Sequence, residues 1–352
     1  MKILVLPGDG IGPEIVDAGM AVLTSVNEAR GLGLEFAYDD IGFASLEKYS
    51  VTVRPELLDK VRQAQGVILG PQSNLDYPPE EEGGLNISAA FRTQLDLYAN
   101  ARPARTRPGV ALGKEGLDLV VMRELTEGFY ADRNLFLGSG EFMPTPDVAM
   151  SMRKLTAKGS ERIARAGFEL AMKRRKKLTA VHKANVLKVT DGLFLTQVRK
   201  VGEEFPEVEL DDVLIDAMAA YLVRDPSRFD VVLATNMYGD ILSDLASELS
   251  GSLGLAGSTM ANETMCVAQA QHGSAPDIAG QDKANPTSLI LSAAMLLQWL
   301  GERHGRDDLH KAGGDIDAAL DAALAKTATR TADLGGAMGT KAFGDHVAGL
   351  VS

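Results

Sequence analysis

Two aspartates lie four residues apart shortly after an apolar run of the chain. Asp240 and Asp244 follow Val231–Ala234 and Asn236, a pattern that predicts a buried strand leading into a helix. Positions i and i+4 share one face of a helix, where two like charges repel each other. A divalent cation with oxygen ligands would offset that repulsion. Since acids also suit a helix N-terminus, the pair alone leaves both interpretations open.

Three arginines could bind an anionic substrate. Arg92 lies in a helical pattern, Arg102 at an expected strand start, and Arg123 directly after the apolar stretch LDLVVM, at an expected strand end. Guanidinium groups bind carboxylates through paired hydrogen bonds. Surface ion pairing is the ordinary alternative, and it explains Arg123 least well because a core strand precedes it.

Further polar side chains follow other expected strands. Lys183 and Asn185 come after LTAVH, and Asp216 ends VLID. A lysine that is kept from protonation can act as a general base, although an exposed loop lysine is the simpler alternative. Ligands of open α/β sheets gather at the carboxyl ends of strands. The side chains expected at such ends are Arg123, Lys183, Asp216 and Asn236.

Two glycine-containing segments could serve a nucleotide. LPGDGIGPE near the N-terminus does not match the dinucleotide fingerprint G-x-G-x-x-G, because the third glycine would have to replace Pro13. HGSAPDIAG, at His272–Gly280, is a loop in which Asp277 could accept hydrogen bonds from ribose hydroxyls. The same carboxylate would repel a 2′-phosphate, which favours NAD over NADP. Taken alone, this loop does not establish a cofactor.

Alternating strand-like and helical patterns predict an α/β fold. The expected strands are Lys2–Leu6, Val67–Leu69, Leu117–Met122, Leu178–His182, Val213–Ile215 and Val231–Ala234. The expected helices begin at Pro13 or cover Ala89–Tyr98, Pro286–Leu300 and Ile316–Lys326. The expected loops are Asp76–Gly84, Gly109–Gly116 and Gly138–Pro146.

Composition narrows the class of protein. A chain of 352 residues predicts two domains, and its 45% of apolar residues can fill their cores. A single cysteine, Cys266, and the lack of a signal segment or long apolar run favour a cytoplasmic protein without a membrane span. A net charge of −12 argues against nucleic-acid binding. The basic run Lys173–Lys177 is typical of a solvated helix end.

Six motifs resemble, in order, those of the β-decarboxylating dehydrogenases of the isocitrate, isopropylmalate, homoisocitrate and tartrate/malate type. The resemblance spans nearly the whole chain. The motifs are GDGIGPE at 8–14, DLYANARPAR at 96–105, RELTEGFY at 123–130, HKANVLK at 182–188, GDILSDLASELSGSLGL at 239–255, and HGSAPDIAG with ANP within 272–286.

The resemblance implies NAD- and divalent-metal-dependent oxidative decarboxylation of a 3-substituted malate-type 2-hydroxy acid. NAD would take a hydride, CO2 would leave, and the resulting enol would be protonated, with Mg2+ or Mn2+ as the Lewis acid. The implied fold is the two-domain isocitrate/isopropylmalate dehydrogenase-like fold, with a shared, non-Rossmann sheet. Residues 1–98 and 251–352 would form a large cofactor-binding domain. Residues 99–250 would form a small domain for dimerisation, substrate and metal.

The resemblance also implies a role for each site residue. The implied metal ligands are Asp216, Asp240 and Asp244, and the implied carboxylate clamp is Arg92, Arg102 and Arg123. Lys183 would be the base and Tyr130 the acid, with Asn185 near the nicotinamide. The implied adenosine pocket is His272, Gly273, Ser274, Ala275, Asp277, Ile278 and Asn285. A homodimer is implied in which Lys183, Asn185 and Asp216 reach the partner's site.

Substrate choice in such enzymes depends on the segment before the first clamp arginine, here GGLNISAAFR. Isopropylmalate enzymes usually place a leucine pair there, and this chain has Ser88, Ala89 and Ala90. Isocitrate enzymes usually carry a Ser and an Asn, and Asn86 and Ser88 stand here in the opposite order. Burying an isopropyl group is worth about 1.5–3 kcal/mol. The segment therefore disfavours isopropylmalate and leaves isocitrate, homoisocitrate or another 3-substituted malate open.

Other functions are weighed against this one. A tartrate or D-malate dehydrogenase (decarboxylating) is the closest alternative. Phosphoryl transfer would require a G-x-x-x-x-G-K-[ST] loop, and the sequence contains none. A ligand-binding regulatory relative without turnover would be expected to lack Lys183, Tyr130 or one of the three aspartates, and all are present.

Overall fold

The computed structural model describes residues 1–110, 112–130 and 140–352, which divide into two units. The first unit comprises Met1–Leu95, Thr106–Gly113 and Ser250–Ser352, so both chain ends belong to it. The second comprises Asp96–Arg105 and Lys114–Leu249. Thr106–Gly113 was expected in the middle domain but packs with the first unit. The reason is Arg107, whose buried guanidinium donates to the carboxylates of Asp317 and Asp321 at 2.7 Å each.

Five strands of the first unit lie in the order β2-β1-β3-β12-β11. Their bounds are β1 Lys2–Leu6, β2 Glu35–Tyr38, β3 Gly66–Leu69, β11 Gly257–Ala261 and β12 Cys266–Ala270. β1 is parallel to β2 and β3, and β12 is parallel to β3 but antiparallel to β11. This order differs from the Rossmann order 3-2-1-4-5-6, as expected from the failed glycine fingerprint.

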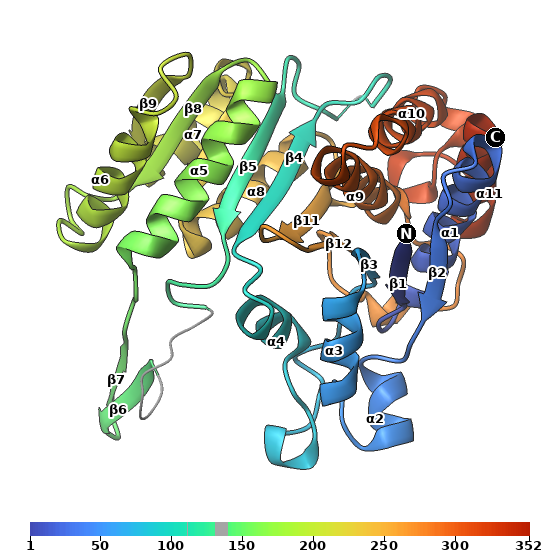
Figure 1. The fold of residues 1–352 in the computed structure, drawn as a ribbon, viewed down its shortest axis with the longest axis horizontal. Helices are drawn as coiled ribbons and strands as arrows, with labels where there is room; N and C mark the ends of the chain where they lie inside the picture. Colours follow the sequence, from blue (N-terminus) through green and yellow to red (C-terminus); the bar gives the residue numbers. More distant parts are fainter. Residues whose placement is uncertain (111, 131–139) are drawn as a thin grey trace. The chain divides into compact units, whose positions relative to one another are not determined.

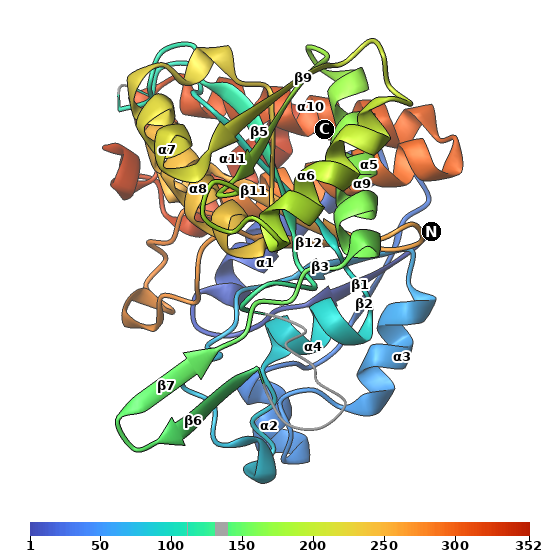
Figure 2. The same ribbon diagram turned by 90° about the vertical axis from the view of Figure 1, so that its left-hand side faces the viewer.

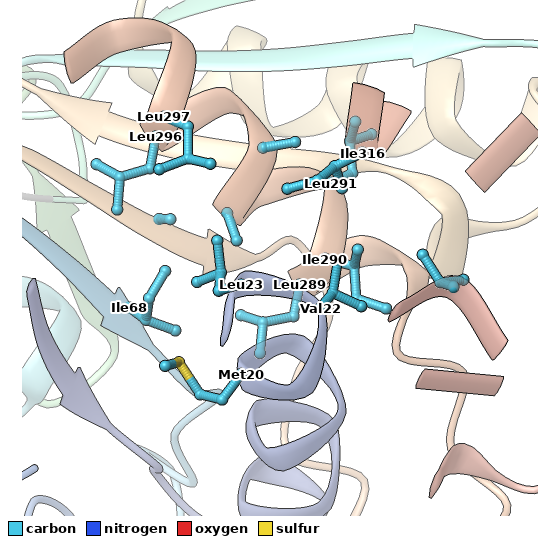
Figure 3. Close-up of a cluster of buried hydrophobic side chains, with 14 of the residues drawn as sticks. Met20, Val22, Leu23, Ile68, Leu289, Ile290, Leu291, Leu296, Leu297 and Ile316 are labelled. Carbon is cyan, nitrogen blue, oxygen red and sulfur yellow. The ribbon is translucent and has the colours of Figure 1, made fainter. Parts of the chain in front are cut away.

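The helices of the first unit are α1 Gly12–Arg30, α2 Phe43–Tyr49, α3 Pro55–Gln63, α4 Ile87–Gln94, α9 Thr287–His304, α10 Asp307–Leu324 and α11 Thr340–Val351. Some of them build a large apolar core. α1, α9, α10 and α11 all contribute to this core (Figure 1). Figure 3 shows Met20 and Leu23 of α1 with Leu289 of α9 and Ile68 of β3. Because α9 is buried along most of its length, its sequence is almost continuously apolar.

The second unit contains five strands in the order β4-β5-β10-β8-β9. Their bounds are β4 Ala99–Arg105, β5 Asp118–Glu124, β8 Lys177–His182, β9 Glu209–Leu214 and β10 Val231–Ala234. The last four in this order are mutually parallel, and β4 is antiparallel to β5. The carboxyl ends of β5, β10, β8 and β9 therefore lie at one edge of these strands.

Helices cover both faces of these strands. α5 (Ala157–Lys173) and α6 (Thr190–Gly202) lie on one face, and α7 (Ile215–Arg224) and α8 (Asn236–Leu249) lie on the other (Figure 2). Successive residues of β10 point to opposite faces. Val231 and Leu233 pack with α5 and α6, whereas Val232 and Ala234 pack with α7 and α8. A strand that is buried on both faces has no polar positions, which explains the continuous run VVLA.

A two-stranded antiparallel hairpin, β6 (Glu141–Thr145) and β7 (Val148–Ser151), extends from the second unit (Figures 1 and 2). A loop was expected over Gly138–Pro146, which was wrong for Glu141–Thr145, and residues 138 and 139 lie outside the described residues. All strand residues of the hairpin are exposed, so its sequence lacks the burial pattern that reveals a strand.

Other expected boundaries also differ from the structure. β9 begins at Glu209 and ends before Ile215, and it was missed in part because its residues are exposed or only partly buried. The helix expected at Ala89–Tyr98 is α4, which begins where Asn86 caps it and ends at Gln94. Arg102 lies in the middle of β4 rather than at a strand start.

The basic run is bound to acids rather than only solvated. Arg174 donates to Asp230 at 2.7 Å and to Asp118 at 2.8 Å, and Asp230 is buried. Within the described parts of the chain, no helix is long and apolar enough to cross a membrane.

Candidate active site

Four candidate side chains stand where the parallel strands of the second unit end. Arg123 is next to last in β5, and Asn236 begins α8 just after β10. Lys183 follows β8 directly, and Asp216 is the second residue of α7 after β9. Their placement at this edge follows from the parallel order of the strands.

Arg123 is the center of a buried hydrogen-bonded cluster. Its side chain is 1% exposed and forms an ion pair with Asp240. Asn236 Oδ1 accepts from its Nη2 at 2.7 Å and its Nε at 3.2 Å. The Asn236 amide in turn donates to the carbonyls of Leu125 and Glu127 at 3.0 and 2.9 Å. Asn236 therefore orients the guanidinium, a role that its place after a strand did not reveal.

Arg102 joins the same cluster from β4. Its Nη1 lies 2.8 Å from Ser243 Oγ, 3.2 Å from Asp240 Oδ1 and 3.5 Å from Asp244 Oδ1. Burial lowers the pKa of Arg102, and the two aspartates oppose that shift. The repulsion between Asp240 and Asp244 is thus offset by buried arginines. Both carboxylates still reach solvent, with side-chain exposures of 35% and 56%. Hard oxygen donors of this kind suit Mg2+ or Mn2+.

Lys183 and Asp216 form a second, more exposed pair through Lys183 Nζ. The hydrogen bond from Lys183 is the main reason that the pKa of Asp216 is lowered, which keeps its carboxylate ionised. Among the described residues of one chain, no three His, Cys, Asp or Glu side chains are grouped so that they could hold a metal ion. The expected set of Asp216, Asp240 and Asp244 is therefore not assembled within a single chain.

The turn that carries Lys183 is anchored by a buried carboxylate. Asp191, which is 0% exposed, accepts from the Lys183 backbone nitrogen at 2.6 Å and forms an ion pair with Arg153. Arg153 also donates to Thr235 Oγ1 at 2.9 Å, at the end of β10. The sequence did not reveal Asp191, because an acid in the first turn of α6 reads as an ordinary helix start.

A histidine anchors the next amide of the same turn. His182 Nδ1 accepts from the Ala184 nitrogen at 3.0 Å, and its Nε2 lies 3.1 Å from Asp212 Oδ2. Asn185 follows with its side chain exposed. Tyr130 is 44% exposed, and the Arg123 guanidinium carbon lies 5.9 Å from the center of its ring.

Replacing Asp191 by asparagine should destabilise the fold by about 3–5 kcal/mol, because it leaves the buried Arg153 without a counter-charge. Urea denaturation followed by circular dichroism measures this free energy of unfolding. Glu203→Gln, at the exposed end of α6, removes the same charge and should change stability by less than about 0.5 kcal/mol. A loss below about 1 kcal/mol for Asp191→Asn would mean that Arg153 finds another partner.

The first unit contains a cavity of about 280 Å³. Its lining includes expected cofactor residues, namely His272, Gly273, Ala275, Ile278 and Asn285. Ser274 and Asp277 belong to the same loop but are not among the lining residues. The Ser274 hydroxyl is instead 2.7 Å from that of Ser73, and Asp277 is exposed. Asp333, which accepts from Asn285 Nδ2 at 3.0 Å, lines the cavity and was missed.

His272, which lines this cavity, has a neutral ring with a buried second nitrogen. Its Nδ1 lies 3.0 Å from the Gly273 carbonyl, which can only accept, so Nδ1 carries the proton. Burial lowers the pKa of His272, which keeps the ring neutral. Its Nε2 is buried and has no hydrogen-bond partner among the residues that the structure describes.

α4 carries the expected substrate residues of the first unit. Asn86 Oδ1 accepts from the Ala89 nitrogen at 2.9 Å, so this side chain caps the helix. Ser88 Oγ accepts from Asn74 at 3.1 Å and donates to Gln72 at 3.2 Å. Arg92 lies one turn after Ser88 on the same face of α4.

A family model described as isocitrate/isopropylmalate dehydrogenase matches residues 2–347. The chain belongs to this family. It is a dehydrogenase that decarboxylates a hydroxy acid, as expected from the motifs, and the alternative without turnover is set aside.

The relatives match this chain over nearly their whole length, and a solved structure matches its fold. The chain is 42% identical to an isocitrate/homoisocitrate dehydrogenase of Thermus thermophilus over 98% of this chain and 97% of the relative. It resembles the crystal structure of isocitrate dehydrogenase from Methylococcus capsulatus with a TM-score of 0.87 and 37% identity, over 99% of both chains. The expected α/β fold of this family is confirmed.

The interpretation that isopropylmalate is disfavoured is not borne out. The chain is 40% identical to a 3-isopropylmalate dehydrogenase of Archaeoglobus fulgidus over 99% of each. The argument from Ser88, Ala89 and Ala90 fails physically, because small side chains remove contact area but add no repulsive group against an alkyl substituent. The Ser88 hydroxyl is also bound to Gln72 and Asn74, so it does not act as an unsatisfied polar group.

Proposed function

We propose that this protein uses NAD and Mg2+ or Mn2+ to oxidise and decarboxylate a 3-substituted malate-type 2-hydroxy acid. The observation that carries the proposal is the cluster of Arg102 of β4 and Arg123 of β5 with Asp240 and Asp244 of α8. The arginines would bind carboxylates of the substrate, and the aspartates would hold the cation. The substrate and the cation would then displace the ion pairs that these side chains now make with each other.

The chain's own residues would move the protons. When bound, the cation would polarise the substrate hydroxyl as a Lewis acid, and NAD would accept the hydride. Lys183 would take the hydroxyl proton as general base, and Tyr130 would protonate the enol carbon after CO2 is lost. Asp216, with its lowered pKa, would be the third metal ligand. Arg92, Ser88 and Asn86 are assigned to substrate binding from the family resemblance.

The preference for NAD rests on the loop of the first unit. The exposed carboxylate of Asp277 would accept from the ribose hydroxyls and repel a 2′-phosphate. His272 and Asn285 line the cavity and would contact the adenosine there. Asn185, on the Lys183 turn, would lie near the nicotinamide.

We further propose a homodimer in which Lys183, Asn185 and Asp216 act in the partner's site. Support comes from the hairpin of β6 and β7, whose apolar side chains are 42–62% exposed at Phe142, Met143, Val148 and Met150. Exposed apolar side chains on a paired strand edge are typical of an interface. Light scattering of the purified protein should give twice the mass of one chain, and a monomer would contradict the shared site.

A substrate panel tests the activity. Purified protein with Mg2+ or Mn2+ should reduce NAD with at least one of isopropylmalate, isocitrate, homoisocitrate or 3-methylmalate, and release CO2. NADP should be a poorer oxidant, and EDTA should abolish the reaction. Tartrate or D-malate as the best substrate would favour the alternative dehydrogenase. No NAD reduction with any of these acids would overturn the proposal.

A further inference from the structure

The N-terminal motif GDGIGPE, which failed as a dinucleotide fingerprint, lies against the loop that lines the first unit's cavity. This loop, His272–Pro286, is called the cofactor loop below. Glu14, in the first turn of α1, uses both oxygens of its carboxylate on the loop. Oε1 accepts from the Gly280 nitrogen at 2.7 Å, and Oε2 accepts from the Asp282 nitrogen at 3.1 Å.

The start of the same motif holds the other end of the loop. The Ile11 nitrogen donates to the Ser274 carbonyl at 2.8 Å, and Ile11 itself lines the cavity. A Cβ on Gly10 would lie 2.0 Å from the Ser274 carbonyl oxygen, so only glycine permits this approach. Asp9 Oδ2 accepts from the Ser73 nitrogen at 3.1 Å, and the Ser73 and Ser274 hydroxyls are 2.7 Å apart.

The cofactor loop needs such support because its backbone is strained. Ala275 and Asp282 have φ angles of 37° and 52°, in the left-handed region that residues with a Cβ rarely adopt. Conformations of this kind persist only where the surroundings determine them. Glu14 accepts hydrogen bonds from the backbone nitrogens of Asp282 and of Gly280, whose φ is also positive at 71°. Loss of that carboxylate would let the loop relax away from the cavity.

We propose that Glu14 is a positioning residue for the adenosine half of the cofactor. Its carboxylate holds the second half of the cofactor loop, so that Ile278, Ala284 and Asn285 are in place before the ligand arrives. A loop that is already ordered loses less entropy on binding, and affinity rises accordingly. The dipole of α1 would also favour an acid at this position. The dipole alone, however, does not explain why the carboxylate accepts hydrogen bonds from two amides of a distant loop. The inference rests on the proposed use of NAD.

The test compares two variants of Glu14 with a matched control on the same helix. Glu14→Ala removes both acceptors, Glu14→Gln leaves one, and Asp17→Asn removes an exposed negative charge one turn later. Calorimetry measures the binding of NAD and of AMP to the full-length protein. We expect the dissociation constants of both ligands to rise about tenfold for Glu14→Ala, less for Glu14→Gln, and not for Asp17→Asn. The kcat at saturating NAD and the KM for the hydroxy acid should stay unchanged.

Each outcome decides between the possibilities. Unchanged AMP affinity in a folded Glu14 variant overturns the inference, as does an equal loss in Asp17→Asn. A fall in kcat with normal AMP binding would also overturn the inference, because Glu14 would then affect turnover and not the adenosine half of the cofactor. Hydrogen exchange in the ligand-free variants should be faster at Gly280 and Asp282 if the carboxylate holds the loop. If the unaltered protein binds neither NAD nor AMP while exchange responds as expected, the proposed cofactor is wrong and the loop brace is retained only as structure. If Glu14→Ala does not fold, Glu14→Gln carries the same comparison.

Discussion

Replacing Lys183 by methionine should lower kcat/KM by about 10²–10⁴-fold, the range that a general base contributes. Methionine keeps most of the apolar stem but has no nitrogen to accept the substrate's hydroxyl proton. Its turn should stay in place, because Asp191 binds the backbone nitrogen of residue 183 and not its side chain. Steady-state kinetics with the best acid of the panel measures the loss.

Two further variants distinguish proton transfer by Lys183 from the effect of its positive charge. Lys183→Arg keeps a cation beside Asp216 but remains protonated, so it should be nearly as inactive as Lys183→Met. Lys188→Met changes an exposed lysine of the same segment and should leave kcat/KM within about twofold of the original. Substantial activity in Lys183→Arg would show that this position supplies only a positive charge, and another base would have to be sought.

Replacing Asp240 by asparagine should weaken Mn2+ binding by at least about 10–100-fold, because the substitution removes the charge of an implied ligand. The same change removes one counter-charge from buried Arg123 and one from Arg102. Mn2+ affinity and urea stability should therefore both fall. Titration calorimetry of the ligand-free protein measures Mn2+ binding without relying on turnover.

The control for this change lies one turn beyond Asp244 on α8. Glu248→Gln removes an exposed charge from the same helix and should alter neither Mn2+ affinity nor stability. If Asp240→Asn binds Mn2+ normally yet is destabilised, Asp240 serves only as the counter-ion of the arginines. That result would remove it from the proposed ligand set while leaving the anion-binding role of Arg102 and Arg123 intact.

Several strands that are buried on both faces could be predicted. β1, β3 and β10 are short apolar runs, β8 is almost fully buried, and all four were predicted. The start of β4, with the sequence ANARPAR, was misplaced and β11, with GSTMA, was missed, because small and polar residues fill positions that a strand pattern would leave apolar. Their pairing with neighbouring strands stabilises them, and no local preference reports that pairing.

The candidate site was predictable as a set of residues but not as a set of contacts. Arg123, Lys183, Asp216 and Asn236 could be placed because each follows an apolar run, and parallel strands bring such positions to one edge. The partners of Arg102 could not, since they depend on the register of β4 against β5, in which Arg102 is opposite Val121. Asp191 and Glu14 were missed for the same reason, because their significance lies in burial and in distant partners.

The amino-acid sequence alone determined the α/β class, the family and the residue types available for acid–base, carboxylate-binding and metal-binding chemistry. These follow from local apolar patterns and from motifs that need no coordinates. Only the tertiary structure decided which charges meet. It pairs Asp240 with two buried arginines, leaves Asp216 beside Lys183, and brings Glu14 to amides 266 and 268 residues away. Such contacts depend on strand register and on the packing of helices against strands, which act over distances that a local sequence pattern does not cover.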